Sequence, residues 1–198
     1  MKVLITGGAG YIGTALVEQL AKIDEISEIR IYDNLSRKNP NLFLCDPIAH
    51  DKIRFIRADI LDTRKLQKAL MGIDVVYHLA AKVSTPFADA DFHGLDQINH
   101  WGSAELSYLL ENQPVQRVVY LSSTSVYGAS ESLVDLQTAP DPKTAYGISK
   151  LRGEDMLGRL NPKMPIHIVR CGNVYGYNKS MRFDAVINRL MFDAHFSG

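Results

Sequence analysis

The sequence predicts an α/β protein with three layers, in which a doubly wound parallel sheet lies between two layers of helices. The first observation is that short apolar runs alternate with helix-like segments through most of the 198 residues. Such alternation is typical of a parallel sheet whose crossover helices cover both faces. The second observation is a glycine-rich turn after the first apolar run, and the third is an acidic residue at the end of the next run. In such folds the ligand crevice lies at the carboxyl ends of the strands.

The glycine-rich turn occupies residues 6–13 and reads TGGAGYIG. Gly7 permits the tight turn, Gly10 lets a pyrophosphate approach the backbone, and Gly13 lets the next helix pack closely on the sheet. The free N–H groups and the positive end of that helix are suited to holding phosphates. Asp33 follows Gly13 by twenty residues, where a carboxylate can accept hydrogen bonds from both ribose hydroxyls.

The segment after Asp33 leaves an alternative cofactor open. We expect residues 34–51 to form a long loop with one helical turn. Arg37 and Lys38 in this loop could meet the 2′-phosphate of NADP, although solvated loop charges are the commoner explanation. Asp33 should repel that phosphate, so we expect NAD to be preferred.

The later elements follow the same alternation. His78, within the fourth strand, is more often a hydrogen-bonded core residue than a base in such a setting. The pattern at 95–112 is helical, with apolar residues on more than one face. This predicts burial by both the sheet and something else, such as a second subunit. Further strands are expected at 53–57, 73–81, 115–122 and 165–170, and a further helix begins at Asp62 or Thr63 with Leu66, Ala69 and Leu70 inward.

Composition is compatible with one globular domain that has a sizeable core. Hydrophobic residues make up 46% of the chain, and 22 basic residues balance 22 acidic ones. There is thus no electrostatic reason to expect nucleic acid or an anionic membrane surface as a partner. The chain starts with a strand and has no bilayer-length apolar run, so we expect neither a signal peptide nor a membrane span. Cys45 and Cys171 lack a neighbouring His or Cys motif, which favours reduced thiols, no metal site and a cytoplasmic protein.

Candidate catalytic groups lie at the end of the fifth strand and at the start of the helix that follows. The segment 122–128 places several hydroxyls at the crevice, including that of Ser123. Tyr146 and Lys150 are four residues apart, so a helix puts them on one face. A nearby ammonium favours the phenolate and makes the tyrosine a usable general base. Taken alone, a tyrosine and a lysine four residues apart would indicate only neighbours on a helix surface. Because this pair follows a dinucleotide-binding motif and a strand end rich in hydroxyls, it favours a catalytic role.

These residues together resemble the extended short-chain dehydrogenase/reductase superfamily, in its NAD-dependent epimerase/dehydratase branch, which includes UDP-galactose 4-epimerase. The resemblance covers almost the whole chain and implies a Rossmann fold. It is highly specific to the family and much less specific to the substrate. It rests on 6–13, 33–35, 59–60, 78–81, Asn99, 122–128, 146–150 and 170–176.

The resemblance also implies roles for individual residues. Tyr146 would be the base, Lys150 would bind the ribose and lower the tyrosine pKa, and Ser123 would complete the triad. Asn99 would support the cofactor region, and Asn173 would contact the substrate together with Ser123 and Tyr146. The residues expected to bind the cofactor are Gly7, Gly10, Tyr11, Ile12, Gly13, Asp33, Asn34, Asp59, Ile60, Leu79, Ala80, Ala81, Asn99, Tyr146 and Lys150.

The reaction implied by the resemblance is 4-epimerisation of a UDP-hexose, by transient hydride transfer to NAD and return to the opposite face of the ketone. Sugar 4,6-dehydratases of the family carry an acidic pair directly after the triad hydroxyl, where this chain has Thr124 and Ser125. Gly172 stands where the family often places an aromatic residue, which implies a looser cofactor pocket. A dehydratase or dehydrogenase of the same family, and an NAD-binding regulatory domain without turnover, remain alternatives.

The same resemblance, together with the apolar faces at 97–112, predicts a homodimer formed by 97–112 and 145–160. It also predicts the domain organisation. Residues 1–176 are expected to form the dinucleotide-binding domain, and 177–198 the start of a substrate-binding region that is otherwise largely missing. A helical pattern over 180–196 fits the beginning of that region. We expect NAD binding by this chain, with weak or absent turnover of sugar substrates.

Overall fold

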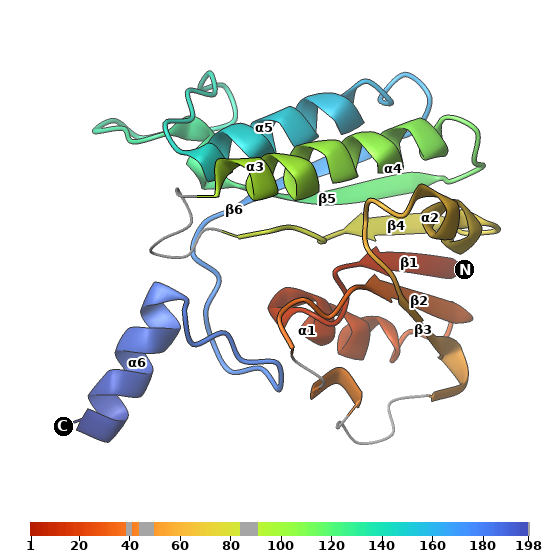
Figure 1. Ribbon diagram of the computed structural model, residues 1–198, viewed down its shortest axis with the longest axis horizontal. Helices are drawn as coiled ribbons and strands as arrows, with labels where there is room; N and C mark the ends of the chain where they lie inside the picture. Colours follow the sequence, from red (N-terminus) through yellow and green to blue (C-terminus); the bar gives the residue numbers. More distant parts are fainter. Residues whose placement is uncertain (39–40, 44–49, 84–90, 198) are drawn as a thin grey trace.

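The computed structural model describes residues 1–38, 41–43, 50–83 and 91–197, and its centre is one parallel sheet (Figure 1). The strand order is β3-β2-β1-β4-β5-β6. All five pairings are parallel. The order reverses between β1 and β4, which is the switch point where doubly wound sheets bind ligands. The strands are β1 (Lys2–Thr6), β2 (Glu28–Asp33), β3 (Ile53–Arg57), β4 (Val75–His78), β5 (Arg117–Ser123) and β6 (Ile166–Cys171).

Helices connect the strands and cover both faces of the sheet (Figure 1). The α-helices are α1 (Tyr11–Leu20), α2 (Thr63–Leu70), α3 (Phe92–Leu95), α4 (Gly102–Leu110), α5 (Ala145–Gly158) and α6 (Val186–Ser197). A π-helical segment, η4 (Asp96–Trp101), joins α3 to α4. Short 3-10 turns are η1 (Asn41–Phe43), η2 (His50–Lys52) and η5 (Thr124–Tyr127).

The two faces of the sheet bury two separate apolar clusters. In β1, Leu4 belongs to the cluster beneath α2, α4 and α5, whereas Val3 and Ile5 belong to the cluster beneath α1. This division follows from the alternation of side chains along a strand. β6 is an edge strand of the sheet, and its Val169 remains 42% exposed. The expected three-layer, doubly wound fold is therefore confirmed.

Two expected helices differ from the observed ones. The expected helix over 95–112 begins earlier, at Phe92, and passes through the π-helical η4 before it continues as α4. The expected helix over 180–196 begins only at Val186. Its first residues are held instead against the rest of the protein, because Ser180 lies 2.9 Å from the Thr14 hydroxyl and Asp184 binds Arg37.

His78 is a core residue, as expected for a histidine within an apolar strand. Its Nδ1 lies 2.7 Å from the Thr6 hydroxyl, and its Nε2 lies 3.1 Å from the Ser103 hydroxyl. The ring stacks on Tyr120 with centroids 5.3 Å apart. Burial lowers the pKa of His78 to about 3, so the imidazole is neutral at neutral pH.

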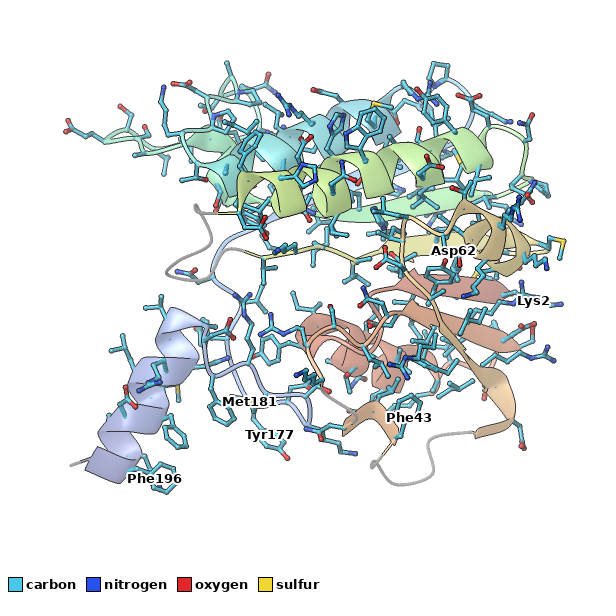
Figure 2. The ribbon with its side chains drawn as sticks, in the orientation of Figure 1. Lys2, Phe43, Asp62, Tyr177, Met181 and Phe196 are labelled. Carbon is cyan, nitrogen blue, oxygen red and sulfur yellow. The ribbon has the colours of Figure 1, made fainter. Side chains whose placement is uncertain are left out.

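The last segment, 176–197, lies beside the sheet, and α6 projects away from it (Figure 1). Figure 2 shows Tyr177 and Met181 in the connection before α6, and Phe196 near the far end of this helix. Phe196 is 70% exposed. The division at residue 176 remains a prediction. Within the described parts of the chain, no helix is long and apolar enough to cross a membrane. Cys171 is a free thiol, and Cys45 lies outside the described residues.

Candidate active site

A cavity of about 920 Å³ opens at the carboxyl ends of the strands, around the switch point between β1 and β4. It brings together most of the residues singled out in the sequence. Among these, the cavity is lined by Gly7, Gly10, Tyr11, Ile12, Gly13, Asp33, Asn34, Ile60, Leu79, Ala80, Ala81, Ser123, Tyr146, Lys150 and Asn173. Asp59 and Asn99 are not on its wall.

The glycine turn packs against the end of β4. Gly7 has φ +73°, and its N–H donates to the Tyr32 carbonyl at 2.8 Å. A Cβ at Gly7 would lie 2.6 Å from the Ala80 nitrogen, and a Cβ at Gly13 would overlap the Gly7 carbonyl. Gly10 precedes the first residue of α1, Tyr11, so the N–H groups that lack a partner within the helix belong to residues that line the cavity. We call this turn, residues 7–13, the glycine cradle. A side chain at Gly7 or Gly13 would disturb it.

Asp33 lies at the end of β2, on the cavity wall. Its Oδ2 accepts a hydrogen bond from the Ala9 N–H at 3.0 Å, and its Oδ1 accepts one from the Leu35 N–H at 2.8 Å. The carboxylate is thus tied to the glycine turn. Arg37, considered above as a contact for a 2′-phosphate, forms an ion pair with Asp184 at 3.0 Å.

Two expected cofactor residues lie behind residues of the cavity wall. Asp59 accepts a hydrogen bond from Asn34 Nδ2 at 2.8 Å and one from the Leu61 N–H at 3.0 Å. Asn99 is 1% exposed and binds both the N–H and the carbonyl of Lys82, at 2.8 Å and 2.9 Å. Lys82 follows Ala81 on the cavity wall. The geometry therefore gives Asp59 and Asn99 supporting positions behind the wall.

The catalytic candidates come from β5 and α5. Ser123 ends β5 and caps η5 by accepting a hydrogen bond from the Ser125 N–H at 3.1 Å. Tyr146 and Lys150 lie one turn apart on α5, and all three side chains reach the same cavity. Lys150 is only 2% exposed, and its ammonium stands 4.2 Å above the Tyr120 ring.

The pKa values in the free protein correct one expectation. Burial raises the pKa of Tyr146, while the charge of Arg182 and a hydrogen bond with Ser123 act in the lowering direction. Burial also lowers the pKa of Lys150 to about 7, against the raising effects of Glu154 and Cys171. In the free protein the pKa of Tyr146 is therefore raised, which is the opposite of the expected lowering by Lys150, because burial disfavours the phenolate.

Sequence reasoning missed three charged residues of the cavity wall, which are Lys82, Arg182 and Asp184. Arg182 and Asp184 line the cavity and bind each other, with Arg182 Nε 3.1 Å from Asp184 Oδ1. They reach the site because the segment before α6 folds back on α1, where the Tyr11 hydroxyl donates to the Gly176 carbonyl. No local pattern in the sequence signals this contact, because the partners are 165 positions apart. Asn173 is exposed on the wall, and a Cβ at Gly172 would meet nothing within 4 Å.

The donor set fits a dinucleotide. The glycine turn leaves room that a side chain would fill, the start of α1 offers N–H groups for phosphates, and Asp33 offers acceptors for a ribose. Among the described residues, no group of three or more His, Cys, Asp or Glu side chains could hold a metal ion.

Comparison with known proteins also indicates a dinucleotide-binding protein. The profile of the NAD dependent epimerase/dehydratase family matches residues 3–194. An uncharacterised UDP-glucose epimerase, YtcB, of Bacillus subtilis is 32% identical over 96% of this chain and 61% of its own length. A UDP-glucose 4-epimerase of Pasteurella multocida is 31% identical over 91% of this chain and 55% of its own length.

Solved structures show the same similarity. UDP-glucuronic acid 4-epimerase from Bacillus cereus, in complex with NAD, has a TM-score of 0.85 and 30% identity over 98% of this chain and 62% of that one. DesIV, a dTDP-glucose 4,6-dehydratase from Streptomyces venezuelae with NAD bound, has a TM-score of 0.87 and 27% identity over 100% of this chain and 63% of that one. The chain thus spans less than two thirds of the length of these relatives. Because the family profile spans nearly all of it, the chain belongs to the NAD-dependent epimerase/dehydratase family.

Proposed function

We propose that this protein is an NAD-dependent nucleotide-sugar epimerase, and that its substrate is a UDP-hexose epimerised at C4. The observation that carries the proposal is that one cavity joins a glycine cradle to the Ser123, Tyr146 and Lys150 side chains. A dinucleotide held by the cradle and a sugar beside the tyrosine would meet within that cavity. The membership of the family and the NAD-bound structural relatives support the cofactor.

In this proposal some residues would bind the cofactor or the sugar, and Tyr146 would transfer the proton. The N–H groups at the start of α1 would hold the pyrophosphate, and Asp33 would accept hydrogen bonds from a ribose. NAD, when bound, supplies the oxidation and reduction chemistry. Tyr146 would remove the proton from the sugar hydroxyl and later return one to the same oxygen. Ser123 would hold that oxygen, and Asn173 would orient the sugar.

The electrostatics of the free site bear on the base. Tyr146 must lose a proton to act, and burial opposes this by raising its pKa, as Cys171 also does. The positive charges of Arg182 and of a protonated Lys150 favour the phenolate, because an opposite charge stabilises the ionised form. The site therefore depends on keeping Lys150 charged, although burial lowers its pKa to about 7.

Two alternatives are distinguished by products. A 4,6-dehydratase is less well supported because Thr124 and Ser125 follow Ser123 where the dehydratases carry an acidic pair. However, dTDP-sugar dehydratases also occur among the relatives. An NAD-binding domain without turnover is the third candidate, because the chain spans 61% of the length of the YtcB protein.

One experiment separates these functions. The protein is incubated with NAD and a panel of UDP-, GDP- and dTDP-sugars, and products are identified by chromatography and NMR, with Tyr146→Phe as the control for site-dependent turnover. A C4 epimer of a UDP-sugar is the expected product. A 4-keto-6-deoxy product would contradict the epimerase proposal. NAD binding by calorimetry without any product would favour the binding domain.

We also propose a cytoplasmic homodimer formed through η4, α4 and α5. This is supported by the large exposed side chains of Trp101 and Tyr108, which are 49% and 51% exposed on these helices. Exposed aromatic residues of this kind are common at interfaces. Sedimentation of the wild type should show a dimer, and Trp101→Glu should shift it toward monomer. A monomeric wild type at high concentration would refute the dimer.

A further inference from the structure

A buried ionic cluster lies one helical turn further along α5 than Lys150, and the proposed function assigns no role to it. Its centre is Glu154, which is 4% exposed. The carboxylate accepts a hydrogen bond from the Ser122 hydroxyl on β5. Its Oε2 also accepts hydrogen bonds from Arg170 on β6, at 3.2 Å from Nε and 2.6 Å from Nη2. Ser122 and Arg170 are register partners in the sheet, so one carboxylate ties two neighbouring strand ends to the helix.

The partners of Glu154 adjoin the reacting part of the site. Ser122 directly precedes Ser123, whose hydroxyl caps η5. The guanidinium carbon of Arg170 lies 4.8 Å from the centre of the Tyr127 ring, at the other end of η5. Glu154 therefore fixes both the strand end that carries Ser123 and the turn that follows it.

Glu154 also lies one helical turn after Lys150, on the same face of α5. Among the described residues, no carboxylate lies within ion-pair distance of the Lys150 ammonium, which faces the Tyr120 ring instead. Burial lowers the pKa of Lys150 to about 7, and the charge of Glu154 is the leading influence that raises it. Without that charge, the buried ammonium would lose its proton at lower pH.

Apart from Glu154 and its positively charged partner Arg170, the titratable groups around Lys150 are neutral at neutral pH. Burial lowers the pKa of His78 on β4 to about 3. Burial raises the pKa of Tyr120 on β5, of Tyr146 on α5 and of Cys171 on β6. Glu154 is thus the negative charge that faces Lys150 in this pH range.

We propose that Glu154 is a positioning residue of the active site, which locks the ends of β5 and β6 to α5 and supplies the negative charge that keeps Lys150 protonated. The consequence for catalysis rests on the proposed function, whereas the effect on Lys150 is a property of the free protein. A contribution to folding stability alone does not explain the buried pair of Glu154 and Arg170, because replacing a buried ion pair with apolar residues is often neutral or stabilising. A charged Lys150 gives the cluster a role that an apolar substitute could not fill.

The test is an NMR pH titration of the cofactor-free protein labelled on its lysine side chains. The Lys150 signal is assigned by its loss in Lys150→Arg. The wild-type lysine should titrate near neutral pH, and Glu154→Gln should move its midpoint down by at least about one pH unit. An unchanged midpoint in Glu154→Gln would overturn the proposal.

Further variants separate charge from folding. Glu154→Gln leaves the Arg170 charge unpaired, so the double variant Glu154→Gln with Arg170→Met removes both charges; it should fold and still show the lowered midpoint. Glu154→Asp keeps the charge and should titrate close to the wild type. The matched control is Glu28→Gln on β2, because Glu28 is also largely buried, at 8% exposed, and binds Arg30 at 2.6 Å. An equal shift in Glu28→Gln would overturn the assignment to Glu154.

Calorimetry with NAD provides the second measurement. At slightly alkaline pH, Glu154→Gln should bind NAD about tenfold more weakly than the wild type, which corresponds to a shift of one pKa unit. An unchanged NAD affinity together with a lowered Lys150 midpoint would overturn the role of Glu154 at the cofactor site. A wild type that does not bind NAD would contradict the proposed function instead, while the titration still decides the effect on Lys150.

Discussion

One methyl group added at Gly7 should strongly disturb the dinucleotide site. The Gly7 φ of +73° lies in the left-handed region, where a side chain costs about 1–2 kcal/mol. The added Cβ would also lie 2.6 Å from the Ala80 nitrogen and 2.7 Å from the Leu79 carbonyl carbon. Because these are backbone atoms at the end of β4, the strand end must move, and overpacking of this kind costs about 1–3 kcal/mol. Gly7→Ala should therefore lower the free energy of unfolding by roughly 2–5 kcal/mol.

Gly72→Ala is the matched control. Gly72 has nearly the same backbone conformation, with φ +70°, but a Cβ there would meet nothing within 4 Å. Only the conformational cost of about 1–2 kcal/mol should remain. For a chain of this size, each kcal/mol lowers Tm by about 2–4 °C. The expected decreases are thus roughly 2–8 °C for Gly72→Ala and 4–20 °C for Gly7→Ala.

The assays are thermal unfolding by circular dichroism and NAD binding by calorimetry. Leu79 and Ala80 line the cavity, so their displacement in Gly7→Ala should weaken NAD binding at least about tenfold, a loss of about 1.4 kcal/mol. Gly72→Ala should bind NAD like the wild type. Equal Tm decreases and equal NAD affinities in the two variants would refute the argument that the close approach of the turn to β4 shapes the site.

Three further predictions concern single side chains. Tyr146→Phe should retain NAD binding in calorimetry but lose about 10²–10⁴-fold in turnover, and a fully active variant would exclude Tyr146 as the base. NAD should bind more tightly than NADP in parallel titrations, with Asp33→Asn reducing the difference; tighter NADP binding by the wild type would remove Asp33 from the ribose. Between its ordinary pKa of 6.5 and about 3, His78 takes up a proton only in the unfolded state, so the free energy of unfolding should decrease by about 1.4 kcal/mol for each unit by which the pH is lowered in this range. In denaturant titrations His78→Asn should flatten this slope, and parallel slopes in both proteins would show that His78 is not buried neutral.

Much of the fold and of the cofactor site could be predicted from the sequence. The parallel sheet follows from the alternation of apolar runs and helical segments, because a strand or a helix needs only a local pattern to bury one face. The glycine turn and Asp33 belong to one strand-turn-helix-strand unit, so their arrangement is set within about thirty residues. Tyr146 and Lys150 share a face because they are four positions apart on a helix. NAD as the cofactor of the family is confirmed by the comparisons.

Other features of the site were decided only by the tertiary structure. Arg182 reaches the cavity because the segment before α6 folds back on α1, through contacts such as that between Thr14 and Ser180, which are 166 positions apart. Glu154 joins Ser122 and Arg170 from two different strands. Periodic patterns in the sequence do not predict contacts between residues that lie so far apart along the chain.

The charge states of the site also depend on packing. Lys150 was expected to lower the pKa of Tyr146, yet burial is the leading influence on both pKa values. Burial is fixed only when β5, β6 and α5 enclose the side chains and exclude water. The sequence by itself therefore determined the secondary structure and the identities of the chemical groups, because these depend on local backbone geometry. The tertiary structure decided which distant groups meet and how strongly water is excluded from them, because both depend on the packing of the whole chain.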